Sequence, residues 1–188
     1  MESTPAPAHT DLTGKVLVAS PSLQDPNFRH TLVYIARHTD EGAVGVVMNR
    51  PTGKVLGDTG GTGPFPASMA ALPLLAGGPV NPTFVTLGVF RPGTTDREWA
   101  CSFSEPPETI AELLAGGSGA HVRAFVGYAG WSAGQLEQEL REDSWRVSDP
   151  SRALFNPAWT PNLWACFAAD RQIWRDLLDF LPVNAGLN

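Results

Sequence analysis

Short runs of apolar, β-branched residues recur along the first part of the chain and predict β-strands. Lys15–Ala19 is one such run, and Thr31–Arg37 and Gly42–Met48 are apolar on both faces. Strands of the latter kind lie inside a sheet that is covered on both sides. Because only the polar stretch His38–Glu41 separates the second run from the third, we expect these two strands to pair as an antiparallel hairpin, ended by Pro51.

Strands and helices alternate in the rest of the chain. Apolar spacing predicts helices at Ser104–Ala115, Ser132–Arg141 and Asn162–Leu181. The serines that open the first two helices stand where N-cap residues belong, and Gln135 completes a capping box with the second serine. Apolar runs predict the other strands, which are Leu72–Leu75, Thr83–Phe90, Trp99–Phe103, Val122–Tyr128 and an edge strand at Trp145–Val147.

The order of these elements indicates the fold class. Strands come first and are then interleaved with helices, which favours an α+β fold with a mixed sheet. Pro51–Ala71 is rich in Gly and Pro without firm periodicity, so we expect a long surface loop with one helical turn near Ser68–Ala71. No linker separates two cores. We therefore expect a disordered arm over residues 1–13 and a single domain over residues 14–188.

Composition and charge narrow the classes of function. The 188 residues include 13 Lys and Arg against 19 Asp and Glu, for a net charge of −6. Affinity for DNA comes mainly from clustered basic residues, which are scattered here, so the composition argues against direct nucleic-acid binding. Cys101 and Cys166 lie far apart without a CxxC motif, as expected for free, buried thiols in a reducing compartment. No secretory signal and no apolar run of ~18 residues occurs, so we expect a cytoplasmic protein without a membrane partner.

Four segments of the chain carry a family resemblance. They are SPSLQDPNFRHTLVYIARHTDEGAVGVVMNRP (Ser20–Pro51), GGPV (Gly77–Val80), VRAFVGYAGWSAGQLEQEL (Val122–Leu140) and SWRV (Ser144–Val147). In order and spacing they resemble the AlgH/YqgE family of small bacterial proteins, over residues 14–147. The resemblance implies one α+β domain with a bifurcated, partly barrel-like β-sheet flanked by helices, and a role in the regulation of transcription. It implies no catalytic residue and no cofactor.

Polar residues gather where the predicted strands end and in the adjoining loops. Asp25 and Asn27 supply hydrogen-bond acceptors, and Arg29 offers a planar guanidinium to an anion. Glycine N–H groups and a helix start can also attract anions. We therefore expect a single concave corner that binds a ligand through Asp25, Asn27, Arg29, Asn49, Arg50, Gly77, Gly78, Tyr128, Trp131, Gln135 and Glu137.

The same residues also have purely structural interpretations. Asp25 can start an Asp-Pro turn by bonding nearby backbone N–H groups, and Arg50 can brace a loop. Gly77 and Gly78 can mark a close approach of two backbones. His38 and Asp40 could offer two metal ligands, but a metal site usually has three or four, so we expect surface residues of the hairpin and no metal.

The sequence favours a non-catalytic binding or regulatory protein, monomeric or weakly dimeric, whose partner is a protein or a small anionic ligand. A small hydrolase is the alternative. Gly130–Gly134 (GWSAG) matches the G-x-S-x-G motif of hydrolases, with Ser132 as nucleophile, although all four histidines precede this serine. Asp25 and His30 could instead hold Mg²⁺ in a phosphohydrolase. A regulator that binds DNA directly is the third possibility.

Overall fold

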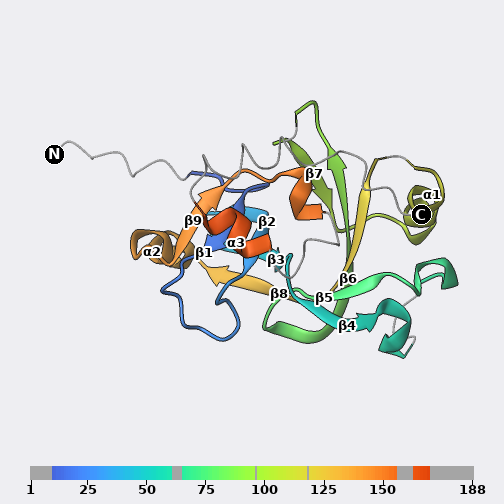
Figure 1. Ribbon diagram of the computed structural model, residues 1–188, viewed down its shortest axis with the longest axis horizontal. Helices are drawn as coiled ribbons and strands as arrows, with labels where there is room; N and C mark the ends of the chain where they lie inside the picture. The colour runs from blue at the N-terminus through green and yellow to red at the C-terminus, as the bar shows by residue number, and fades with distance from the viewer. Residues whose placement is uncertain (1–9, 61–64, 96, 118, 156–162, 170–188) are drawn as a thin grey trace.

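Nine strands form one mixed sheet that curls into a half-barrel, with helices packed against it (Figure 1). The computed structural model describes residues 10–60, 65–95, 97–117, 119–155 and 163–169. The strands are β1 (Val16–Ala19), β2 (Leu32–Thr39), β3 (Gly42–Val47), β4 (Pro51–Val55), β5 (Pro73–Ala76), β6 (Val80–Pro92), β7 (Trp99–Ser102), β8 (His121–Ser132) and β9 (Trp145–Ser148). The helices are α1 (Pro107–Ala115), α2 (Gln135–Arg141) and α3 (Leu163–Ala168), with 3-10 turns η1 (Leu56–Thr59), η2 (Ala67–Met69) and η3 (Arg152–Phe155). The predicted α+β fold is confirmed.

Strand β8 belongs to both parts of the sheet. Its first part pairs in parallel with β5 and antiparallel with β6, and its last part pairs antiparallel with β3. Between these parts Gly127 has a φ of 70°, and a Cβ atom there would lie 2.4 Å from the carbonyl oxygen of Gly78. Only glycine fits such a position without strain. We call β1, β2, β3, β9 and α2 the first half of the molecule, and β4 to β7 with α1 the second half.

The predicted hairpin is confirmed in the first half. β2 and β3 pair antiparallel, with Val33 opposite Val47 and a bulge between Ile35 and Arg37. β1 lies on the other side of β2, and β9 follows β1 at the edge of the sheet, as the sequence predicts for an edge strand.

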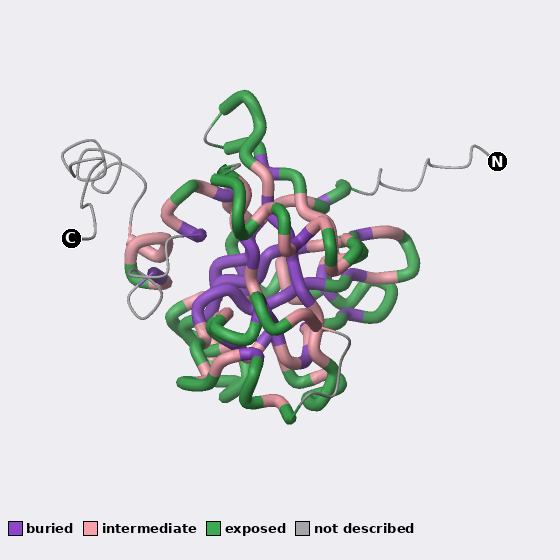
Figure 2. The backbone as a smooth tube through the Cα atoms, turned by 90° about the vertical axis from the view of Figure 1, so that its right-hand side faces the viewer, coloured by how far each residue is buried: buried purple, intermediate pink, exposed green. Residues whose placement is uncertain are grey.

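Three clusters of buried side chains lie on the faces of these strands. Buried positions concentrate in the middle of the fold (Figure 2). Inside the half-barrel, Tyr34 of β2 packs with Phe90 of β6 and Phe125 of β8. The outer face of the first half packs against Leu136 of α2, and the outer face of the second half packs against Ile110 of α1. The central strands are therefore covered on both faces, which explains why their sequences are apolar throughout.

Two predicted boundaries are wrong for identifiable reasons. Pro51–Val55 is not part of a surface loop but forms β4, which pairs with β5 although most of its residues are exposed. The first helix begins at Pro107 with Pro106 as its N-cap, because two consecutive prolines have the backbone shape of a helix start, and Ser104 therefore lies before it. The predicted helical turn near Ser68–Ala71 is present as η2.

The two ends of the chain are described only in part. Of the predicted N-terminal arm, residues 10–13 are described, and Leu12 among them is buried. Of the predicted helix Asn162–Leu181, α3 is described, and the remainder from residue 170 onward lies outside the described residues. No helix among the described residues has the length and the apolar character that a bilayer crossing needs.

Candidate functional site

The loop over residues 20–30 is held in shape by its own turn. The carbonyl oxygen of Asp25 accepts hydrogen bonds from the N–H groups of Phe28 (3.0 Å) and Arg29 (2.8 Å). Its carboxylate Oδ1 accepts a third from the N–H of Asn27 at 2.7 Å. Asp25 therefore starts the turn, as its structural interpretation predicts. Asn27 and Arg29 lie exposed on this loop.

Two residues that follow β3 fasten this loop to the sheet. Arg50 donates from Nη1 to the carbonyl oxygen of Asn27 (2.6 Å) and from Nη2 to that of Arg29 (3.1 Å). Asn49 is buried, accepts a bond from the N–H of Leu32 and donates one to the carbonyl oxygen of His30, both at 2.9 Å. The side chains of Asn49 and Arg50 therefore brace the loop, and the guanidinium of Arg50 is already engaged.

Arg29 stands beside Arg50 but differs from it in its bonding. Within the described part of the chain, its guanidinium forms no hydrogen bond and no ion pair. Burial lowers the pKa of Arg50, the neighbouring charge of Arg29 lowers it further, and the carboxylate of Asp25 acts in the opposite direction. Two guanidinium groups thus lie close together on a braced loop, and that of Arg29 is the one left to meet a ligand.

Aromatic residues join this loop to β8. Phe28 stacks on Trp131 with ring centroids 6.1 Å apart, and its ring meets Trp145 edge-on at 5.5 Å. The indole N–H groups of both tryptophans donate to the same oxygen of Glu139, at 2.8 and 2.7 Å. The structure therefore brings the loop and Trp131 together. Because Trp131 is only 6% exposed, it supports the loop from the core and does not face solvent.

The start of α2 differs from the sequence prediction. Ser132 is the last residue of β8, and the N-cap of α2 is Gly134, whose φ of 74° is left-handed. The predicted N-cap role of Ser132 is therefore wrong, although its contact with Gln135 exists. Both the N–H and the Oγ–H of Ser132 point to Gln135 Oε1 at 3.1 Å, and Gln135 Nε2 donates to Glu139. With seven residues, α2 is too short for its dipole to make the start of the helix an anion site.

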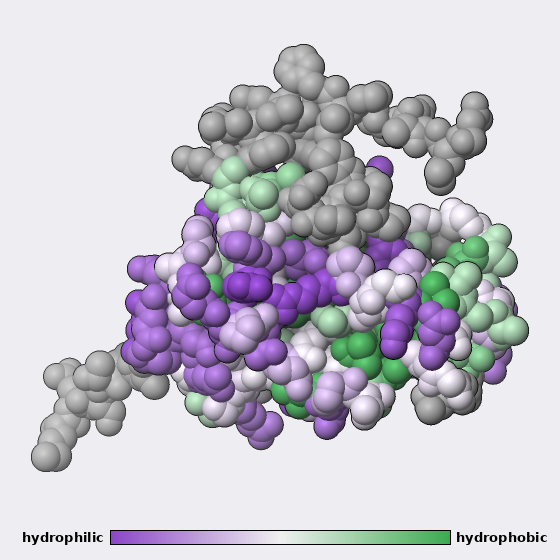
Figure 3. All heavy atoms as spheres, turned by 60° about the horizontal axis from the view of Figure 1, so that its bottom comes forward, coloured by the Kyte–Doolittle hydropathy of each residue, from purple (hydrophilic) through white to green (hydrophobic). Residues whose placement is uncertain are grey.

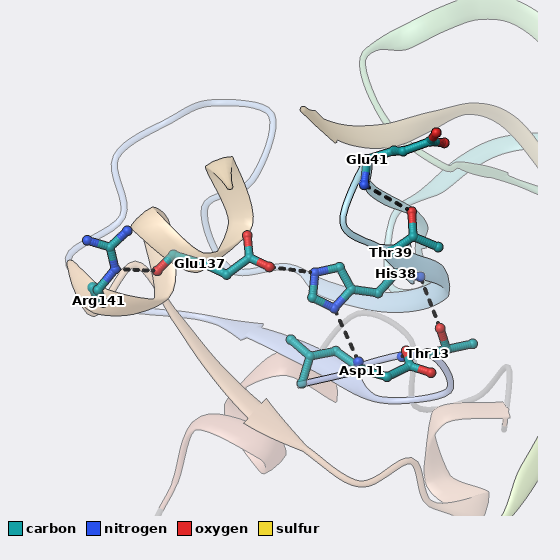
Figure 4. Close-up of polar contacts among 8 residues, drawn as sticks. Asp11, Thr13, His38, Thr39, Glu41, Glu137 and Arg141 are labelled. Carbon is teal, nitrogen blue, oxygen red and sulfur yellow. Dashed lines mark hydrogen bonds and ion pairs between the residues drawn. The ribbon is translucent and has the colours of Figure 1, made fainter. Parts of the chain in front are cut away.

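Glu137 lies on α2 and reaches across to β2 (Figure 4). His38 Nδ1 accepts the N–H of Leu12 at 3.2 Å, so its proton is on Nε2, which donates to Glu137 Oε1 at 2.9 Å. His38 is only 4% exposed, so the prediction that it lies at the surface is wrong. Residues 11–13 and α2 cover this end of β2, with Thr13 Oγ1 accepting the N–H of His38. Both nitrogens of His38 are occupied, which leaves none for a metal.

Gly77 and Gly78 follow β5 and lie beside the end of β3, since the carbonyl oxygen of Gly77 accepts the N–H of Val47 and the N–H of Ala76 donates to the carbonyl oxygen of Arg50, both at 2.8 Å. A Cβ atom on Gly77 would be 2.3 Å from the carbonyl oxygen of Gly127, and one on Gly78 would be 2.2 Å from the carbonyl carbon of Tyr128. The N–H of Gly77 already donates to Val126, so the glycines mark a close approach of β5 and β8. Tyr128 packs against the cluster inside the half-barrel, on the opposite face of β8 from Trp131. Of the predicted corner, Gly77 therefore lies close to Asn49 and Arg50, whereas Tyr128 and Trp131 lie on opposite faces of β8.

The described histidines make aromatic contacts or a hydrogen bond. His30 packs on the ring of Trp164 at 4.2 Å, His38 bonds to Glu137, and His121 stacks on Phe155 at 5.6 Å. Among the described residues no three His, Cys, Asp or Glu side chains group as metal ligands do. Both cysteines are free but only partly buried, so their predicted burial is partial.

Burial nevertheless raises the pKa of the Cys101 thiol strongly, with Arg91 acting in the opposite direction. Because the thiolate is the nucleophilic form of cysteine, a raised pKa makes this thiol unreactive near neutral pH.

Comparison with known proteins gives a consistent result. The AlgH-like family model matches residues 16–178. A UPF0301 protein of Streptomyces coelicolor is 36% identical over 174 residues, which cover 82% of this chain and 84% of that protein. One of Nocardia farcinica is 34% identical over an alignment of 194 positions, and the alignment covers 93% of this chain and 85% of that protein.

Solved structures share the same fold. The solution structure of the AlgH protein from Pseudomonas aeruginosa has a TM-score of 0.61 and 28% identity, and the match covers all of both chains. The crystal structure of a protein from Corynebacterium diphtheriae has a TM-score of 0.59 over 93% of this chain and 90% of that one. At 22% identity, this second likeness concerns the fold alone.

Proposed function

The chain belongs to the AlgH-like family, and on this premise we propose that it is a non-catalytic binding protein whose loop over residues 20–30 recognises an anionic group. The anionic group belongs to a partner protein or to a small ligand. A regulatory effect on transcription then follows indirectly, through that partner, in the cytoplasm. The acidic net charge of −6 fits an indirect route better than direct contact with DNA.

The observation that carries the proposal is the contrast between Arg29 and Arg50. Arg50 and Asn49 hold the loop backbone in one shape, and Arg29 on that loop has no partner among the described residues. A guanidinium is a planar fork that binds carboxylate or phosphate through two parallel hydrogen bonds. A loop that is ordered before binding loses less entropy when the ligand arrives.

The placement of the polar side chains supports binding without catalysis. Ser132 Oγ lies 3.1 Å from Gln135, and the described histidines pack or bond to other residues, so no general base lies beside this serine in the described part of the chain. Glu139 accepts two indole N–H groups, and Glu137 is bonded to His38. Side chains that a hydrolase would use therefore serve the fold.

The test compares Arg29→Gln with Arg37→Gln. Arg37 on β2 is also exposed and has no partner among the described residues. It therefore matches Arg29 in charge, exposure and bonding, but it lies outside the loop over residues 20–30. Each protein is immobilised and exposed to cytosolic lysate, and retained proteins and small molecules are identified by mass spectrometry. We expect at least one species that the parent protein and Arg37→Gln retain and that Arg29→Gln loses. Identical sets from all three proteins would refute the proposal.

A further inference from the structure

A second group of basic side chains lies at the opposite end of β8. This strand has 12 residues, or roughly 40 Å of extended chain before its bend is considered, and it begins at His121 while Trp131 lies near its other end (Figure 1). His121 and Arg123 are two residues apart on β8 and therefore point to the same face of the sheet. That face is the inner one, because Phe90, opposite His121, belongs to the inner cluster.

The two side chains meet the 3-10 turn η3. The ring of His121 stacks on Phe155 with centroids 5.6 Å apart and an interplanar angle of 21°. Arg123 donates from Nη2 to the carbonyl oxygen of Phe155 and from Nη1 to that of Val122. Arg152 is the first residue of the same turn and is exposed. Phe155 thus brings three basic residues from two distant segments to one place.

The positive charges of Arg123 and Arg152 both act on His121. Burial lowers the pKa of His121, and the charges of Arg123 and Arg152 lower it further. Burial also lowers the pKa of Arg123, whose two bonds both go to carbonyl oxygens. In the described part of the chain no carboxylate pairs with Arg123. A partly buried cation without a counter-ion is costly, and an anion would relieve that cost.

Polar atoms of His121 and Arg123 are open to a ligand. Every buried side-chain nitrogen or oxygen among the described residues has a hydrogen-bond partner. The ring nitrogens of His121 and the Nε–H of Arg123 have no partner in that part of the chain, so these atoms are in contact with solvent. Unused donors on two neighbouring side chains therefore face outward beside the charge of Arg152.

We propose that His121 and Arg123, next to Arg152, form a binding site for a phosphate group. A phosphate monoester carries close to two negative charges at neutral pH and three acceptor oxygens, which matches the guanidinium of Arg123 and a protonated imidazole of His121. A carboxylate carries a single charge and balances the group less well. This site is separate from the loop over residues 20–30, so it stands or falls independently of the proposed function.

Binding at this site has a signature in the titration of His121. A phosphate next to the imidazole favours its protonated form, so the pKa of His121 should rise by about one unit or more when phosphate binds. By linkage, phosphate should bind more tightly as the pH falls through that range. A structural cluster without a ligand would show neither effect.

The experiment follows the ring protons of His121 by NMR through a pH titration, with and without inorganic phosphate. Glycerol 3-phosphate is the second probe, which shows whether a phosphate ester also fits, and acetate is the carboxylate control. We expect the pKa of His121 to rise with inorganic phosphate and to change little or not at all with acetate. A similar rise with glycerol 3-phosphate would show that the site also accepts an ester. No shift with either phosphate, or an equal shift with acetate, would overturn the proposal.

Variants test which side chains cause the shift in the pKa of His121. Arg152→Gln, at an exposed position, should reduce the shift without unfolding the protein, whereas Arg123→Gln should abolish it. Because Arg123 also bonds to Phe155, Arg123→Lys serves as the variant that keeps the charge and should keep most of the shift. Arg29→Gln and Arg37→Gln should leave the shift unchanged. A shift that survives both Arg152→Gln and Arg123→Gln, or that disappears in Arg29→Gln, contradicts the assignment.

Discussion

The two halves of the molecule use their polar side chains in different ways. In the first half, Asn49, Arg50 and Glu139 are consumed by bonds to backbone or to indole N–H groups, and they hold a loop and two tryptophans in place. At the start of β8, where this strand pairs with β6 of the second half, Arg123 and His121 have unused donors and no bonded acid among the described residues. The surface also differs between the two sides of the molecule. Hydrophilic side chains gather over the side with α2 and β9, and hydrophobic side chains gather over the side with β4 and β5 (Figure 3). A polar side chain therefore indicates a ligand-binding site only where its hydrogen-bonding groups are not already bonded within the protein.

The joint between the halves should be the most sensitive position. Gly127→Ala would place a Cβ atom 2.4 Å from the carbonyl oxygen of Gly78 at a φ of 70°. Because backbone must move on both sides, we expect a loss of about 4 kcal/mol or more in the free energy of unfolding. Gly53→Ala is the control, since it has a similar φ but open space, and should cost about 1 kcal/mol. Equal losses in urea unfolding would show that β8 does not need its bend.

Removal of the shared acceptor tests the bracing of the first half. Glu139→Ala leaves the N–H groups of Trp131 and Trp145 without a partner in nearly buried positions. Two such donors should cost about 3 kcal/mol in the free energy of unfolding. The matched change in the second half is Glu105→Ala, which breaks a partly exposed pair with Arg91 and should cost about 1 kcal/mol or less. If the two variants unfold at the same urea concentration, the contrast between the halves is wrong.

The loop offers a smaller test within the first half. Asn49→Ala removes the partners of the Leu32 N–H and the His30 carbonyl oxygen, and we expect a loss of about 2 kcal/mol in the free energy of unfolding. Arg29→Gln removes no contact with a described residue and should change stability by less than about 0.5 kcal/mol. A large loss for Arg29→Gln would reveal a structural role and would weaken the binding assignment.

The smallest effect concerns pH and His121. Burial and the charges of Arg123 and Arg152 hold its folded-state pKa below 6.5, so the unfolded chain takes up a proton at higher pH than the folded protein does. Its contribution to stability is therefore complete above pH 6.5 and is lost as the pH falls from there through the folded pKa. His121→Gln should flatten the decline in unfolding free energy over this range. An unchanged slope, measured by urea unfolding at a series of pH values, would contradict the pKa shift.

The sequence predicts the parts of the fold that local pattern determines. β1, β2 and β3 follow from apolar runs, and the hairpin follows from the short link between the last two. β4 was missed because its residues are mostly exposed, with Gly53 inside it, and its pairing with β5 is not a local property. The sheet's division likewise depends on Gly127, which looks in the sequence like any glycine in a strand.

The sequence predicts which residues belong to the candidate site but not the contacts that they make. The sequence could single out Arg29, Arg50 and Trp131, since polar groups and aromatics at strand ends are visible in it. It could not show that Arg50 is engaged and Arg29 is not, because the difference lies in which carbonyl oxygens each guanidinium reaches. The bond between His38 and Glu137 joins residues 99 positions apart, and no local pattern predicts such a contact.

The late place of β8 in the chain has a consequence for synthesis. Three earlier strands, β3, β5 and β6, each take β8 as a partner, yet it leaves the ribosome after all of them. Until then the nascent polypeptide carries strands with unpaired edges and apolar faces, which is the kind of species that aggregates or recruits chaperones. Translation that stalls before residue 121 should therefore yield a product that cannot complete its sheet, and release of the last third of the chain becomes the step that commits the molecule to its native state.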